Sequence, residues 1–124
     1  MSSSPELAPV EAITSTVRKF ECCKLRPEEF HHLDHLTVIT CYLEEMPLRA
    51  ALARMRTVLK KFTAYHKAKG YNETITCFWI AKVAQVLVTE AEGLQLPELI
   101  ERVHAALGNK ELLFRHYSRG RVLS

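Results

Sequence analysis

Apolar side chains recur at intervals of three and four residues through most of this chain, which is the spacing of one face of an α-helix. The clearest run is Leu48, Leu52, Met55, Leu59 and Phe62. The few glycines (4) and prolines (5) lie mostly between such runs, where they can end one helix or begin the next. The pattern predicts an all-α, single-domain bundle of four main helices, with room for a short additional N-terminal helix.

The residues between these runs indicate where each helix begins and ends. Pro27 and Pro97 suit the first turn of a helix. Asn72 is a favourable N-cap, and Gly70 and Gly108 suit helix ends. We therefore expect a short helix over residues 10–23, long helices over 27–46, 47–70 and 72–89, and a shorter helix over 97–108.

Length and composition limit the chain to one globular domain, because 124 residues with 48% hydrophobic and 25% charged side chains build a single modest core. We expect residues 1–9, rich in Ser and Pro, to be disordered, and residues 10–124 to form the helical domain. No apolar run approaches the roughly 20 residues of a membrane span. The N-terminus also lacks the pattern of a signal peptide, so we expect a cytoplasmic protein without a membrane partner. Its four cysteines include no Cys-x-x-Cys pair, which favours reduced thiols.

The basic residues do not by themselves predict nucleic-acid binding. The net charge is only +3, and the cations of the second long helix, such as Arg56 and Lys60, have no aromatic residues interleaved with them. A solvated helix face explains them better, so we expect nucleic acid to be a less favoured partner than a small molecule. The pattern does not indicate an oligomeric state.

Three of the six histidines fall in the segment Phe30-His31-His32-Leu33-Asp34-His35-Leu36. On a helix, His32 and His35 lie one turn apart on the inward stripe, and His31 lies about 100° from His32. The inward stripe continues through Leu36, Ile39, Tyr42, Leu43 and Met46. We expect Asp34, Thr37, Cys41, Glu44 and Glu45 on the opposite side.

Two further residues are expected at the same end of the bundle as this histidine pair. His66 is the last inward position of the second long helix, and Glu73 lies in the first turn of the third. Short connections make consecutive helices antiparallel neighbours. The topology therefore predicts that His32, His35, His66 and Glu73 converge.

Imidazoles and a carboxylate at one site are typical ligands of zinc or iron, and an open coordination position would admit water or substrate. We therefore expect a small metal-dependent enzyme acting on an unidentified small molecule. The expected ligands of its divalent metal ion are His32, His35, Glu73 and His66. Arg115 and Tyr117, from the polar tail, would orient an anionic substrate. The catalytic candidates are Glu73, His66, Tyr71, Arg115 and Tyr117.

Purely structural explanations exist for the same residues. His32 and His35 can be core histidines bonded to carboxylates such as Glu21 or Glu73. His66 can be a cation at a helix C-terminus, and Glu73 a carboxylate at a helix N-terminus. The chain would then be a non-enzymatic helical binding module with a polar ligand pocket. We expect His31 and His104 at the surface.

Several motifs resemble one family of small, mostly uncharacterised bacterial proteins. They are Phe20-Glu21, the segment 30–36, Tyr71-Asn72-Glu73-Thr74-Ile75-Thr76 and Tyr117-Ser118-Arg119. The family pattern is Phe-x-His-x-x-His-Leu, then Tyr-His-Glu-Thr-x-Thr, then Tyr-Ser-Arg, and it covers most of the chain after Val17. The resemblance implies a bacterial source and site residues His32, His35 and Glu73, and it names no reaction. Asn72 stands where the family pattern has histidine.

Overall fold

The computed structural model describes residues 10–67, 72–90, 93–109 and 111–112, and these residues contain no strand. The elements are α1 (Val10–Glu21), a 3-10 turn η1 (Pro27–Glu29), α2 (His32–Glu45), α3 (Leu48–Tyr65), α4 (Glu73–Glu90) and α5 (Leu96–Leu107). The predicted all-α bundle with a short N-terminal helix is confirmed. Within the described residues, no helix has both the length and the apolar character that crossing a membrane requires. The disorder expected for residues 1–9 lies outside the described residues.

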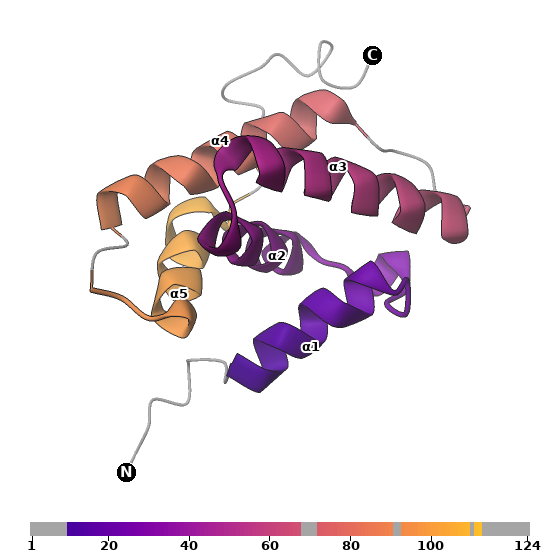
Figure 1. Cartoon of the computed structure of the whole chain (residues 1–124), viewed down its shortest axis with the longest axis horizontal. Coiled ribbons are helices and arrows are strands. Elements are labelled where there is room, and N and C mark those ends of the chain that lie inside the picture. The colour runs from indigo at the N-terminus through magenta and orange to yellow at the C-terminus, as the bar shows by residue number, and fades with distance from the viewer. Residues whose placement is uncertain (1–9, 68–71, 91–92, 110, 113–124) are drawn as a thin grey trace.

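Helix α2 is the centre of the bundle. Figure 1 shows α3 and α4 along one side of it, with α1 and α5 on the other, and α2 packs against all four. Every residue of α2 from 36 to 42 is buried. Helix α4 is apolar on most sides but is less completely covered, since its Val88 is 86% exposed.

Aromatic rings join α1 and α3 to the start of α2. The ring of Phe20, fully buried on α1, stacks on Phe30 with the centroids 4.3 Å apart. Phe62 of α3 lies against both rings, at 5.2 Å from Phe20 and 5.6 Å from Phe30. We call Phe20, Phe30 and Phe62 the aromatic cluster. It fixes the segment that leads into the histidine pair.

The helix expected over residues 27–46 is divided in two. A 3-10 turn covers Pro27–Glu29, and α2 begins only at His32. Phe30 leaves the helical path and packs into the aromatic cluster. The new helix starts with the Asp34 carboxylate, which accepts a hydrogen bond from the His31 backbone N–H at 3.0 Å. This places His32 in the first turn of α2.

The other helix boundaries follow the sequence signals more closely. Asn72 is the N-cap of α4, since its Oδ1 accepts a hydrogen bond from the Ile75 N–H at 3.0 Å. Gly108 directly follows α5, as expected. Helix α3, however, ends at Tyr65, and Lys67 takes a left-handed conformation with φ of 55°. The predicted stop at Gly70 lies outside the described residues.

Thr37 and Cys41 lie on the side of α2 opposite the histidine stripe, as expected, but that side is not left open. Both residues are buried, because α1 and α5 cover this part of α2. Cys41 packs in a small apolar cluster with Ile13 of α1 and Ile100 of α5. The Thr37 hydroxyl donates to the Leu33 carbonyl at 2.9 Å, so its burial leaves no polar atom without a partner.

Candidate functional site

His32 sits in the first turn of α2 and reaches two other helices. Its ring packs edge-on against Trp79 of α4, with centroids 4.5 Å apart. Its Nε2 lies 2.9 Å from the carbonyl oxygen of Leu107, the last residue of α5. A carbonyl oxygen can only accept, so Nε2 carries the hydrogen and the lone pair of the neutral ring is on Nδ1. The bond also satisfies one of the carbonyls that a helix end leaves unpaired.

His35 lies one turn further along α2, and its surroundings keep it uncharged. The ring is half-buried against Phe30, with the centroids 4.6 Å apart. Burial, with a smaller effect from the nearby His32, lowers the pKa of His35 to about 4. Within the described part of the chain, its ring nitrogens make no hydrogen bond. His35 is therefore a neutral imidazole at physiological pH.

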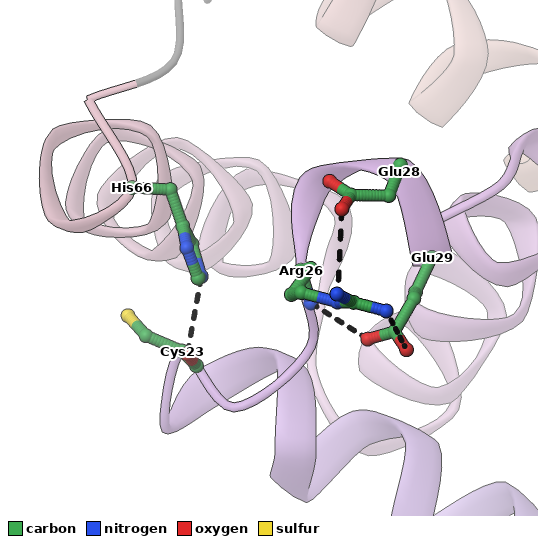
Figure 2. A network of polar contacts seen from close by, with 5 residues as sticks. All are labelled: Cys23, Arg26, Glu28, Glu29 and His66. Carbon is green, nitrogen blue, oxygen red and sulfur yellow. Dashed lines mark hydrogen bonds and ion pairs between the residues drawn. The ribbon is translucent and has the colours of Figure 1, made fainter.

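His66 shares the aromatic cluster with His35 but turns its ring nitrogen elsewhere. Its ring lies 4.7 Å from that of Phe62. Its Nε2 donates to the carbonyl oxygen of Cys23 at 3.1 Å, which ties the end of α3 to the segment after α1 (Figure 2). The expected common end of the bundle is thus real for His35 and His66, although the two rings are engaged with different partners.

A second polar group stabilises the segment between α1 and α2. Figure 2 shows Arg26 beside Glu28 and Glu29 of the 3-10 turn. The Arg26 guanidinium lies 3.6 Å from Glu28 and 3.4 Å from Glu29, and the Arg26 backbone N–H donates to Glu29 at 2.9 Å. These exposed contacts pin the chain between α1 and α2 and, with it, Phe30 in the aromatic cluster.

Glu73 does not join the histidines at the core as the topology suggested. It lies in the first turn of α4 with its side chain 47% exposed, and it forms an ion pair with Arg56 of α3. The Arg56 Nε is 3.1 Å from both carboxylate oxygens. An exposed carboxylate at a helix N-terminus is favoured by the helix dipole alone. The sequence pattern missed Arg56 as its partner.

The four predicted ligands are therefore not gathered around one point. His32 and His35 are neighbours, whereas His66 and Glu73 bind Cys23 and Arg56. Within the residues that the structure describes, no three His, Cys, Asp or Glu side chains are arranged to hold a metal ion. Three other predicted site residues, Tyr71, Arg115 and Tyr117, lie outside the described residues.

His104 was expected at the surface, and that expectation is wrong. It is half-buried, with Nε2 3.0 Å from both the Leu33 carbonyl and the Thr37 hydroxyl of α2. Burial is the main reason that its pKa is lowered. The signal was available in the sequence, because Ile100 is buried one turn earlier on the same face of α5. Two hydrogen bonds thus join α2 and α5 in opposite directions. One runs from His104 to the Leu33 carbonyl, and the other runs from His32 to the Leu107 carbonyl.

Comparison with models of protein families, with curated proteins and with solved structures gives no match for this chain. The resemblance to small bacterial proteins, including its choice of His32, His35 and Glu73, therefore stays a prediction.

Proposed function

We propose that His32 and His35 are the protein ligands of a divalent metal ion in a small enzyme that acts on a small molecule. The observation that carries the proposal is the bond from His32 Nε2 to the Leu107 carbonyl. Histidines that bind metals usually donate their second ring N–H to a carbonyl or carboxylate, which fixes the tautomer and the ring orientation. His32 has this arrangement, and its Nδ1 is the nitrogen suited to a metal.

The properties of His35 support the same proposal. Protons compete with a metal ion for an imidazole, so a ligand must be neutral to bind well. With a pKa of about 4, His35 is neutral throughout the physiological range. It follows His32 by three residues on α2, and two histidines at this spacing can share one ion.

The proposal is limited to these two ligands, because His66 and Glu73 have other partners. Imidazole nitrogen suits zinc or iron, and the bound ion would act as a Lewis acid on water or substrate. His32 and His35 also lie in the first turns of α2, where the helix dipole is positive. An anionic small molecule is therefore the favoured substrate class.

Metal analysis of protein purified without a histidine tag tests the proposal. We expect close to one zinc or iron per chain, lost in the His32→Ala/His35→Ala variant. His35→Phe, which keeps a ring against Phe30, should lose metal without losing the fold. The matched control is His66→Ala, which removes an imidazole with the same kind of carbonyl bond, to Cys23, and should keep the metal. Wild-type protein that neither contains nor takes up zinc or ferrous iron would exclude the metal site.

A second candidate is a non-enzymatic helical binding module. Two observations support it. The described residues place no third metal ligand beside His32 and His35. The aromatic rings of Trp79 and Phe30 flank the two imidazoles. In this case the protein would be metal-free and correctly folded. The His32→Ala/His35→Ala variant would then change stability or ligand binding but no metal content.

A further inference from the structure

A cavity of about 370 Å³ opens at the other end of α2 from the histidine pair. It lies between the second half of α1, the C-terminal part of α2, α3 at Arg54 and the start of α5. Glu44 follows His32 by twelve residues, which is about 18 Å along a helix. The cavity is therefore separate from the site proposed above. Its size falls within the range of about 300–1,000 Å³ that is typical of small-molecule sites.

One wall of the cavity is built from a fixed polar network. The buried Tyr42 donates its hydroxyl to Glu21 Oε2 at 2.5 Å, and Arg54 Nη2 lies 3.3 Å from the same oxygen. The Arg54 guanidinium also sits 5.8 Å from the centroid of the Tyr42 ring. Glu21 thus accepts a hydrogen bond from Tyr42 and forms an ion pair with Arg54, and this wall is organised before any ligand arrives. Apolar side chains of Val17, Met46 and Leu96 line the rest.

The rim of the cavity carries positive and negative side chains that form no ion pairs with described residues. Arg18, Glu44 and Glu45 line the cavity, are exposed, and form no ion pair with any described residue. Glu44 and Glu45 occupy the last turn of α2, which contains no basic residue. Carboxylates there oppose the negative end of the helix dipole. Such unfavourable local choices tend to be kept where they serve a function.

Cys41 is a neutral part of the cavity lining. It is only 8% exposed, lines the cavity, and makes no hydrogen bond to a described residue. Burial, with smaller effects from Glu45 and Glu44, raises the pKa of its thiol to about 11. The group therefore stays protonated and is a weak donor without a protein acceptor.

We propose that this cavity binds a small zwitterion of the α-amino acid type with an apolar side chain. The ammonium group would pair with Glu44 and Glu45, which α2's dipole also favours. The carboxylate would pair with Arg18, and the apolar side chain would pack on Val17 and Met46. In the occupied cavity, each of these charged side chains would have a ligand group of opposite charge, and the apolar wall would be covered.

Calorimetric titration of the full chain with phenylalanine and three related compounds tests the proposal. Phenethylamine lacks the carboxylate, hydrocinnamate lacks the ammonium group, and glycine lacks the apolar side chain. We expect phenylalanine to bind at least about tenfold more tightly than each of the other three. No binding of phenylalanine, or equal binding of either singly charged analogue, would overturn the proposal.

Variants locate the binding on the protein. Glu44→Gln/Glu45→Gln and Arg18→Gln should each weaken phenylalanine binding at least about tenfold. Glu11→Gln and Lys19→Gln, which change exposed charges on α1 that do not line the cavity, are the controls and should bind normally. Circular dichroism confirms that each variant folds. Equal affinity in the test and control variants would place the ligand elsewhere. The His32→Ala/His35→Ala variant should bind phenylalanine normally. Failure of the cavity proposal can therefore be distinguished from failure of the metal-site proposal.

Discussion

Tyr42 and His35 show two ways in which single polar residues are accommodated on α2. Tyr42 is 3% exposed and donates its hydroxyl to a charged acceptor, Glu21. Burial, with a smaller effect from Glu21, raises the pKa of the phenol. His35 has no such acceptor among the described residues and instead stays uncharged, with its pKa lowered to about 4. Burial acts on both, but it favours the neutral form of each group, so the pKa values move in opposite directions.

The Tyr42 hydroxyl can be tested directly. Tyr42→Phe keeps the ring but removes a hydrogen bond to a carboxylate, which is worth about 1.5–3 kcal/mol. Glu21 keeps Arg54 and is partly exposed, so we expect a loss near the lower end of that range in urea unfolding. Tyr65→Phe is the matched control, because Tyr65 is 69% exposed and its hydroxyl should matter little. Equal losses in the two variants would mean that the Glu21 contact is not stabilising.

Between elements, the two histidine bonds that join α2 and α5 should act together. His32 caps the last carbonyl of α5, and His104 caps Leu33 at the start of α2. Removing His32 leaves the Leu107 carbonyl without this donor, at a cost of about 1–3 kcal/mol. Removing His104 should cost less, because the Leu33 carbonyl keeps its bond from the Thr37 hydroxyl. Since both bonds hold the same pair of helix ends, breaking one should weaken the other.

A double-mutant cycle measures this coupling. In denaturant unfolding, His32→Ala and His104→Ala should show an interaction free energy of at least about 0.5 kcal/mol. His66→Ala is the comparison, because His66 makes the same kind of bond between α3 and the segment after α1. Its effect should add to that of His104→Ala. Additive effects of His32→Ala and His104→Ala would show that the two bonds act independently.

Element boundaries were predictable where a local side chain decides them, and less so where tertiary packing does. The Asn72 cap and Gly108 act within one turn, and the structure confirms both. The interruption at Phe30 depends on its ring stacking on Phe20, ten residues away and in another helix. No local pattern announces such a contact, so residues 27–46 were predicted as one helix.

Over the whole molecule, the sequence predicted the all-α class but not which side of each helix finds a partner. Apolar periodicity points to one buried face, whereas α2 has four neighbouring helices and buries Thr37 and Cys41 as well. Glu73 shows the same difficulty on α4, which is apolar on several sides. Its register could not decide between the core and Arg56. The candidate site was therefore predictable only for His32 and His35, which lie on one helix.

The stability of the molecule in acid follows from the same buried imidazoles. At neutral pH, His35 is uncharged in both the folded and the unfolded chain. Below its ordinary pKa of 6.5 the unfolded chain binds a proton that the folded chain refuses until about pH 4. The free energy of unfolding must therefore decrease as the pH falls through this window. His104 acts in the same direction, because its pKa is also lowered.

We expect unfolding by urea to become easier between pH 6.5 and 4, with His35 contributing up to about 3 kcal/mol of the loss. His35→Phe, which cannot be protonated and keeps a ring against Phe30, should flatten this part of the pH profile. Val38→Ala, a change in the core that carries no charge, is the control: it should lower stability by a similar amount at every pH. The nuclear magnetic resonance signal of the His35 ring should titrate near pH 4. A ring that titrates near 6.5, or a His35→Phe profile as steep as that of the wild type, would show that His35 is protonated as readily in the folded chain as in the unfolded one.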